Sequence, residues 1–166
     1  SSSSLYHGAS LPFSEDALTS RTISPYAASK AAMEVVAFPY HYLYGMDITI
    51  LRYFTAYGPF GRPDMSVFRF IQGVANGKPI ELYGDGSQSR DFTYIDDIVD
   101  GTLKSFKPMG FEILNLGYGG QPIPVQDLIG YIEDSLGKRA TIRQLPIHRA
   151  DMSETQADIS KAKRLL

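Results

Sequence analysis

The sequence predicts an α/β protein. Short runs of β-branched and aromatic residues, which are typical of buried strands, alternate with longer runs of helix-forming residues. Clusters of glycine, proline and serine separate these runs and indicate the turns between them. Strands that alternate with helices along one chain are the pattern of the α/β class, in which helices cover a largely parallel sheet.

The first elements follow from their end signals. Residues 5–24 are rich in Pro, Ser, Gly and Thr, which predicts a long surface loop. A helix is then predicted from Pro25 to about Tyr44, because Ser24 is a suitable N-cap and proline fits the first helical position. Gly45 supplies the residue that ends this helix.

The later elements alternate between strands and helices. Gly77 and Gly137 are predicted to end two of the helices, and Asp96 is predicted to be the N-cap of a third. The predicted strands cover residues 48–54, 80–83, 91–94, 111–116 and 141–145, and the predicted helices cover residues 66–76, 96–106, 125–136 and 159–166.

Composition excludes several classes of function. The chain has 166 residues, 43% of them hydrophobic and 20% charged, with a net charge of −2. This balance is globular and gives no support to a nucleic-acid partner or a membrane-surface partner. There is no cysteine and there are only three histidines, so we expect no disulfide, no thiol nucleophile and no metal site. No apolar run approaches about 18 residues, and the expected location is the cytoplasm.

Tyr26 and Lys30 are the first candidates for chemistry. They are one helical turn apart and therefore lie on the same face of the predicted helix. An adjacent ammonium favours the ionised phenolate, which can act as a general base on a hydroxyl that is losing a hydride. Taken alone, the spacing is explained more readily by an exposed lysine beside a half-buried tyrosine.

The segments around Tyr26 and Lys30 are similar to those of a known family. Several segments, in this order along the chain, resemble the extended short-chain dehydrogenase/reductase family, in particular its nucleotide-sugar epimerases and dehydratases. Within that family the sequence is most similar to the UDP-glucuronate 4-epimerases. The matching segments are residues 2–6, 12–15, 24–30, 51–65, 90–97 and 157–164.

The resemblance implies NAD as the cofactor and assigns the catalytic groups. Tyr26 matches the tyrosine that takes the proton from the sugar 4-hydroxyl, and Lys30 matches the lysine that holds the nicotinamide ribose. Ser2 matches the residue that hydrogen-bonds the same 4-oxygen, although a serine run alone would be interpreted as a disordered tail. Tyr53 matches a position near the nicotinamide, with strand packing as the alternative.

The serines next to Ser2 favour epimerisation. The related 4,6-dehydratases carry Asp-Glu where this chain has Ser3 and Ser4, and UDP-glucuronate decarboxylases carry Glu at the position of Ser4. A serine cannot supply the proton that those reactions need. The resemblance therefore implies 4-epimerisation of a UDP-sugar through a 4-keto intermediate, with UDP-glucuronate and UDP-galacturonate as the expected pair and with Ser3 and Ser4 in substrate binding.

Two alternatives to this function are open. The substrate could be another nucleotide sugar, such as UDP-glucose or a UDP-N-acetylhexosamine. The chain could instead be a non-catalytic nucleotide-sugar-binding piece.

Five further residues are assigned to the nucleotide sugar by the resemblance. Arg62 matches an arginine near the substrate end of the site, where a guanidinium suits the carboxylate of a uronate; a surface arginine is the alternative. Thr55 matches a contact to the nucleotide sugar, and Arg90 matches an arginine that binds the diphosphate. Tyr83 lies where the family packs the uracil ring, with core packing as the alternative, and Asp151 matches a contact to the uridine ribose.

Some features depart from the family pattern. Residues 117–120 read Gly-Tyr-Gly-Gly after a predicted strand, but they lack the third glycine and the later acidic residue of a dinucleotide fingerprint. We therefore predict a tight turn at residues 117–120. We also expect the chain of 166 residues to be a piece of a longer protein, without the N-terminal NAD-binding half. His148, Arg149 or neither could contact the diphosphate.

The resemblance also implies a domain division. Residues 1–58 are expected to form the C-terminal part of a doubly wound, dinucleotide-binding domain. Residues 59–166 are expected to form mainly a smaller α/β nucleotide-sugar-binding domain, with residues 94–117 as a segment that can return to the first domain. In the family the helix that carries the tyrosine packs across a dimer interface, which implies a homodimer.

Overall fold

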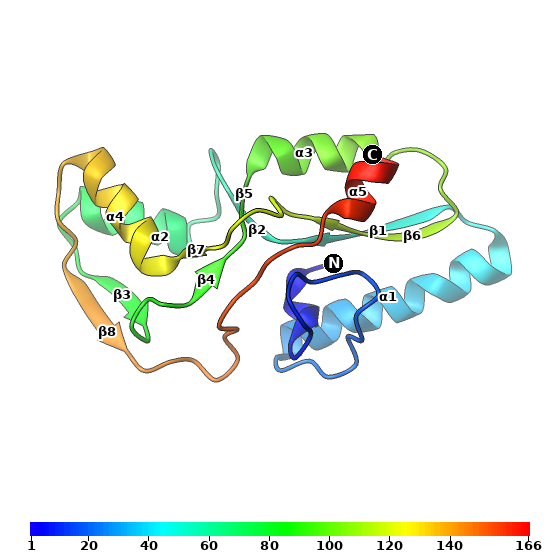
Figure 1. The fold of residues 1–166 in the computed structure, drawn as a ribbon, viewed down its shortest axis with the longest axis horizontal. Helices are drawn as coiled ribbons and strands as arrows, with labels where there is room; N and C mark the ends of the chain where they lie inside the picture. The colour runs from blue at the N-terminus through cyan, green and yellow to red at the C-terminus, as the bar shows by residue number, and fades with distance from the viewer. The chain divides into compact units, whose positions relative to one another are not determined.

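The computed structural model describes residues 1–166, which form two compact units (Figure 1). Unit 1 contains residues 1–56, 91–121 and 155–166, and unit 2 contains residues 57–90 and 122–154. Helices and pairs of parallel strands alternate along the chain, which confirms the α/β class. Residues 155–166 belong to unit 1, although the resemblance places them in the second domain.

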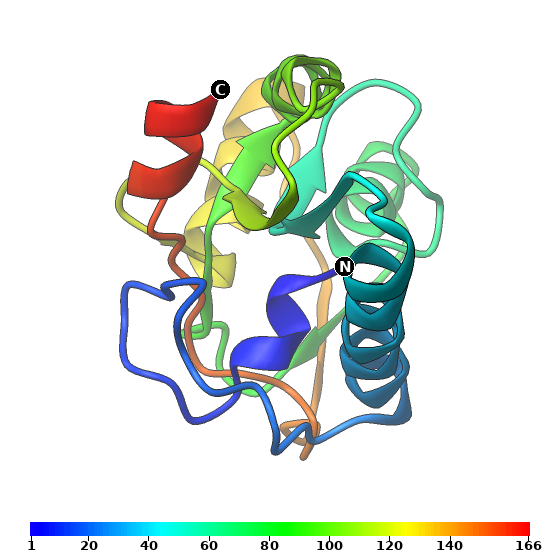
Figure 2. The same cartoon turned by 90° about the vertical axis from the view of Figure 1, so that its right-hand side faces the viewer.

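Unit 1 is built on two parallel strands, β1 (Ile48–Tyr53) and β6 (Phe111–Leu116). Helices α3 (Ile95–Lys104) and α5 (Ser160–Leu165) lie on one face of this pair, while α1 (Pro25–Tyr44) and the 3₁₀ helix η1 (Ser3–Tyr6) lie on the other (Figures 1 and 2). The short strands β2 (Thr55–Tyr57) and β5 (Phe92–Tyr94) pair with each other. The core between the strands and α3 and α5 consists of Leu51, Ile98, Leu114, Leu116 and Ala162.

The predicted ends of α1 are confirmed. The Ser24 hydroxyl accepts a hydrogen bond from the Ala27 N–H at 3.1 Å, and Pro25 occupies the first helical position. Gly45 ends the helix in the left-handed region at φ 64°, where its N–H donates to the His41 carbonyl. Because both ends are fixed, the residues of the first turns have defined positions on the helix.

The prediction of a surface loop over residues 5–24 is wrong at its start. Leu5 and Tyr6 lie in η1 and are fully buried, and Phe13 is buried as well. The rings of Tyr6 and Phe13 stack with centroids 4.9 Å apart, and both pack near Phe54. Turn-forming residues dominate the composition of this segment, but Leu5 and the rings of Tyr6 and Phe13 are nevertheless buried.

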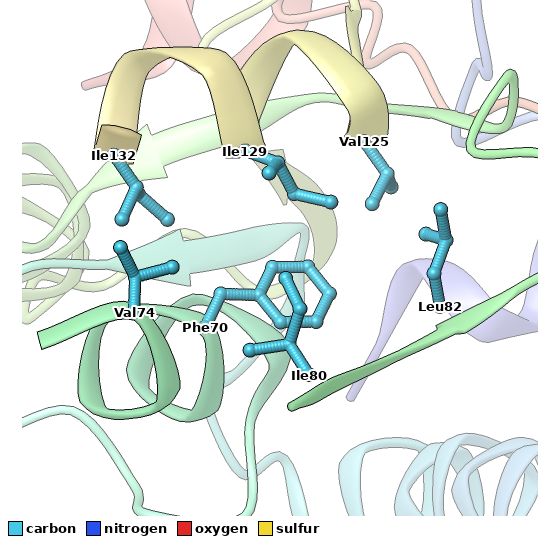
Figure 3. Packing of buried hydrophobic residues seen from close by; sticks show 7 residues of the cluster. All are labelled: Phe70, Val74, Ile80, Leu82, Val125, Ile129 and Ile132. Atoms are coloured by element: carbon cyan, nitrogen blue, oxygen red, sulfur yellow. The ribbon is translucent and has the colours of Figure 1, made fainter. Parts of the chain in front are cut away.

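Unit 2 has its own hydrophobic core. Strands β3 (Ile80–Tyr83) and β8 (Ile142–Leu145) pair in parallel, and β4 (Ser89–Arg90) pairs antiparallel with β7 (Ile123–Pro124). Helices α2 (Ser66–Ala75) and α4 (Val125–Leu136) face each other across an apolar layer that β3 completes (Figure 3). The members of this layer are Phe70, Val74, Ile80, Leu82, Val125, Ile129 and Ile132.

The prediction that Asp96 caps a helix is wrong. Helix α3 begins at Ile95, its N-cap residue is Tyr94, and no side chain makes a capping hydrogen bond. Asp96 instead lies in the first turn with Asp97, where a carboxylate interacts favourably with the positive end of the helix dipole. Among the helices of the chain, none is both long and apolar enough to cross a membrane. The cytoplasmic location stays a prediction.

Candidate active site

The phenol and the ammonium predicted for catalysis lie at the start of α1. Tyr26 is the second residue of the helix and is 54% exposed. The Lys30 Nζ lies 5.5 Å from the centroid of the Tyr26 ring. Lys30 takes part in none of the ion pairs of the chain. The two groups are therefore adjacent and can both reach a ligand.

The serine run is an ordered segment that packs beside this helix. Ser2 is buried, bridges to Tyr53 of β1 as a parallel partner, and is the N-cap of η1. Its hydroxyl donates to the Ser4 hydroxyl at 3.1 Å and accepts from the Ser4 N–H at 3.2 Å. Ser3 is also buried, and η1 contacts α1 (Figure 2). The alternative of a disordered tail is therefore wrong.

Tyr53 and Thr55 follow each other on β1 and β2. The Tyr53 hydroxyl shares a hydrogen bond of 3.1 Å with the Thr102 hydroxyl of α3, and its ring packs on the core of unit 1. The backbone N–H of Thr55 donates to the Asp91 carbonyl at 3.3 Å. Tyr53 thus has a packing role in this structure, and its contact with a cofactor stays a prediction.

A buried ion pair, not anticipated from the sequence, connects β1 to α1. The Arg52 Nε and Nη2 donate to the two carboxylate oxygens of Glu34 at 2.9 and 2.7 Å. Their side chains are only 3% and 8% exposed. Although burial disfavours both charges, the hydrogen bonds between them raise the pKa of Arg52 and lower the pKa of Glu34. Both residues therefore stay charged at neutral pH.

The same guanidinium continues into a longer polar network. The Arg52 Nη1 donates to the Tyr6 hydroxyl at 2.8 Å and to the Glu15 carbonyl at 3.2 Å. The Tyr6 hydroxyl donates to the Asn115 Oδ1 at 2.7 Å, and Asn115 is the register partner of Arg52 on β6. Burial raises the pKa of Tyr6 to about 12, which keeps this hydroxyl available as a donor. A lone arginine in a strand of apolar residues was the available sequence signal.

Three of the residues assigned to the nucleotide come together in unit 2. Tyr83 and Asp151 line the same pocket of about 190 Å³, together with Asp85, Ser87 and Gln88. Arg90 bonds through its Nη2 to the Asp151 carboxylate and through its Nη1 to the Ser89 carbonyl at 2.7 Å. A flat ring, a carboxylate and a guanidinium are the groups that would contact a base, a ribose hydroxyl and a diphosphate.

His148 and Arg149 do not line this pocket. The His148 Nδ1 accepts a hydrogen bond from the Ala150 N–H at 3.2 Å, so it is used within the turn that precedes Asp151. A diphosphate contact from either residue stays a prediction.

Arg62 lies on an exposed loop of unit 2. Its Nε and Nη2 donate to the two carboxylate oxygens of Asp64 at 3.0 and 2.5 Å, and both side chains are mostly exposed. The guanidinium therefore presents its two-donor edge to a carboxylate in this structure. Arg62 is not among the residues that line the pocket with Tyr83.

The glycine-rich segment at residues 117–120 bends at Gly117 and Gly120 and is tied to a carboxylate. The N–H groups of Tyr118 and Gly119 donate to the Asp91 carboxylate at 2.8 and 3.0 Å. These are the donors that a phosphate cradle would need. Two of these donors are thus occupied by Asp91, and the absence of a phosphate cradle in this segment stays a prediction.

Comparison with known proteins places this fold in a class. Residues 1–117 match the model of the NAD dependent epimerase/dehydratase family. The chain belongs to this family. A curated relative, the UDP-glucuronate 4-epimerase of Thermodesulfobacterium geofontis (strain OPF15), is 54% identical over 166 residues, which are 100% of this chain and 51% of the relative. The chain thus spans about half the length of such curated relatives.

Solved structures agree with this assignment. The UDP-glucuronic acid 4-epimerase from Bacillus cereus, in complex with UDP-glucuronic acid and NAD, is similar with a TM-score of 0.94 at 41% identity, over 100% of this chain and 53% of that chain. The UDP-N-acetylglucosamine 4-epimerase from Methanobrevibacter ruminantium M1, in complex with UDP-N-acetylmuramic acid, has a TM-score of 0.90 at 30% identity, over 99% of this chain and 54% of that chain. These matches confirm the predicted fold and family.

Proposed function

We propose that these residues supply the proton-transfer groups and the nucleotide-sugar contacts of an NAD-dependent UDP-sugar 4-epimerase, with UDP-glucuronate as the substrate. The observation that carries this proposal is the Tyr26 phenol beside the Lys30 ammonium, at the start of a helix that packs on the serine segment. The relatives named for this activity and bound to NAD and UDP-glucuronic acid support it.

The donor set of unit 1 fits one end of the cofactor. A phenol and an unpaired ammonium on adjacent helical turns suit the hydroxyls of a ribose, so Tyr26 and Lys30 would hold the nicotinamide ribose. When bound, NAD supplies a reversible hydride acceptor. The N–H groups of Tyr118 and Gly119 are bonded to Asp91, so we do not assign them to the diphosphate of NAD.

The protein groups have distinct roles in the proposed reaction. Tyr26 takes the proton of the sugar 4-hydroxyl. It returns the proton after the 4-keto sugar has rotated in the site and presents its other face. Lys30 places its ammonium beside this phenol, 5.5 Å from the centroid of the ring. Ser2 hydrogen-bonds the same 4-oxygen, and Ser3 and Ser4 complete the contact to the sugar. Neither serine supplies an acid for elimination or decarboxylation, which leaves epimerisation.

Residues of unit 2 are proposed to hold the UDP part and the sugar carboxylate. Tyr83 packs on the uracil, Asp151 binds the ribose, and Arg90 binds the diphosphate. Arg62 binds the uronate carboxylate through the edge that it presents to Asp64 in this structure. Thr55 is proposed to contact the nucleotide sugar from β2.

Substitution of Arg62 tests the choice of substrate. We expect Arg62→Ala in the natural full-length protein to raise KM for UDP-glucuronate about 10- to 100-fold, because a bidentate bond to a charged group contributes about 1.5–3 kcal/mol. KM for neutral UDP-glucose should change less than threefold. Steady-state kinetics with both substrates measure the difference.

The matched control for this test is Arg69→Ala. Arg69 is also an exposed arginine of unit 2 and is paired with Glu81. Its loss should leave both KM values unchanged. Equal effects of Arg62→Ala on both substrates would favour the alternative of a neutral nucleotide sugar.

The other alternative is a non-catalytic nucleotide-sugar-binding piece. It is distinguished by the NAD content of the purified full-length protein. About one equivalent of NAD per chain, together with turnover, supports the enzyme. Binding of UDP without bound NAD and without turnover supports the non-catalytic binding piece.

We further propose that the full-length protein is a homodimer that pairs through α1. The second half of this helix carries seven large hydrophobic side chains that are at least half exposed. Apolar surface of this extent indicates an interaction surface. These residues are Val35, Val36, Phe38, Tyr40, Tyr42, Leu43 and Tyr44.

The mass of the full-length protein in solution tests this proposal. We expect light scattering at micromolar concentration to give twice the mass of the polypeptide. Val36 and Leu43 are seven residues apart on one side of α1, so Val36→Glu with Leu43→Glu should give the monomer. Leu103→Glu, on an exposed site of α3, should leave the dimer intact. A monomer at every concentration would contradict the proposal.

A further inference from the structure

Glu34 follows Tyr26 and Lys30 along one side of helix α1, and its carboxylate is buried. The three residues are spaced by four, so each lies about one turn after the previous one on the same side of the helix. Helix α1 is a continuous helix over these positions. A rotation or slide of the helix that displaces Glu34 therefore displaces the phenol and the ammonium as well.

The guanidinium of Arg52 fixes Glu34 and the serine segment at the same time. Its two bonds to Glu34 define the orientation of α1 relative to β1, because a bidentate pair restricts both distance and angle. Its third bond reaches Tyr6, the last residue of η1, the 3₁₀ helix that Ser2 caps. Ser2 itself bridges to Tyr53, the residue after Arg52. One side chain thus connects all the segments that hold Ser2, Tyr26 and Lys30.

Stability alone gives a weak account of this ion pair. A buried pair loses the hydration of two charges, and replacement of such pairs by apolar side chains of similar volume is often neutral or stabilising. The surroundings of the guanidinium are partly aromatic, because Arg52 lies over the Tyr6 ring at 4.9 Å from its centroid and that ring stacks on Phe13. A methionine pair could fill the same space, but it would not define an angle between α1 and β1.

We propose that Arg52 and Glu34 are positioning residues that hold the Tyr26 phenol and the Lys30 ammonium in register with Ser2. This inference rests on the proposed function for its consequence on catalysis. Neither residue touches the substrate in the proposed reaction. Their effect is on how often the three reacting groups are correctly arranged, which appears in kcat rather than in the affinity for the nucleotide sugar.

The test compares two variants of the natural full-length protein. Glu34→Gln leaves the buried Arg52 charge without a counter-charge and replaces one of its two acceptor oxygens by a donor, so we expect both the melting temperature and kcat to fall. The double variant Glu34→Met with Arg52→Met removes both charges, so the melting temperature should recover to within a few degrees of the unaltered protein. We expect its kcat per bound NAD to stay at least 10-fold lower, with KM for UDP-glucuronate changed less than threefold.

The control for a general loss of stability is Ile98→Ala. Ile98 is carried by α3 rather than by α1 or η1, and it lies in the core of unit 1 with Leu51 and Leu114. This variant should lower the melting temperature and leave kcat per bound NAD within twofold. Recovery of kcat together with stability in the double methionine variant would overturn the positioning role.

A second readout does not depend on turnover. Hydrogen exchange should be at least 10-fold faster in the double methionine variant at the amides of residues 27–34, while the amides of β6 keep their rates. Unchanged exchange there would also overturn the proposal. Absence of any epimerase activity in the unaltered protein would instead contradict the proposed function, and exchange would then decide whether the ion pair fixes α1.

Discussion

Replacement of Tyr26 by phenylalanine in the natural full-length protein is expected to lower kcat for epimerisation of UDP-glucuronate by about 10³-fold. Proton transfer by a positioned side chain contributes about 10²–10⁴-fold, and phenylalanine keeps the ring while it removes the group that carries the proton. Tyr26 is half exposed, and its hydroxyl has no buried partner that the change would leave unpaired. The melting temperature and the far-ultraviolet circular dichroism should therefore stay close to those of the unaltered protein.

Two further measurements make this result specific. KM for UDP-glucuronate should change less than about threefold, because a group that acts on the transition state contributes little to ground-state binding. Tyr131→Phe, which removes an exposed hydroxyl from α4, is the matched control and should keep kcat within twofold. A Tyr26→Phe protein that is folded and fully active would contradict the assignment of Tyr26 as the base.

Replacement of Asp91 by alanine is expected to destabilise the protein by about 3–5 kcal/mol. The Asp91 carboxylate is 1% exposed and accepts hydrogen bonds from three backbone N–H groups. The donors are Tyr118 at 2.8 Å, Gly119 at 3.0 Å and Ala157 at 2.9 Å. Alanine would remove the acceptor of the buried Ala157 N–H and of the part-buried N–H groups of Tyr118 and Gly119, and a buried group left unsatisfied costs about 1–3 kcal/mol.

Urea unfolding of the full-length protein measures this loss. The midpoint should fall while the slope stays unchanged, since the surface exposed on unfolding is the same. Asp100→Ala is the matched control, because this exposed carboxylate forms only an ion pair one turn away with Lys104 on α3, and it should cost no more than about 0.5 kcal/mol. A loss below about 1 kcal/mol for Asp91→Ala would show that other groups satisfy these amides.

Much of the local structure follows from the sequence because its causes are local. Ser24, Pro25 and Gly45 define the ends of α1 through bonds within a few residues of the chain. The failures also have physical reasons. Asp96 has the residue type of an N-cap, but the N-cap of α3 is Tyr94, two residues earlier than that type suggests. The segment around Tyr6 has the composition of a loop, yet it is buried because β1 and α1 enclose it.

The sequence by itself determined the α/β class, the order of the elements and the placement of Tyr26 and Lys30 one turn apart. It also indicated that the chain changes direction at residues 117–120. These properties depend on spacing and on residue type, which can be read within a window of a few residues.

Only the tertiary structure decided which polar side chains are buried together. Arg52 bonds to Glu34 across 18 residues and to Tyr6 across 46 residues, and Tyr6 bonds to Asn115 across 109 residues. No local pattern contains such pairs, because they exist only when two parallel strands place Arg52 and Asn115 side by side on the face opposite the apolar core. Burial then requires each charge and each donor to find a partner, and that requirement selects the network.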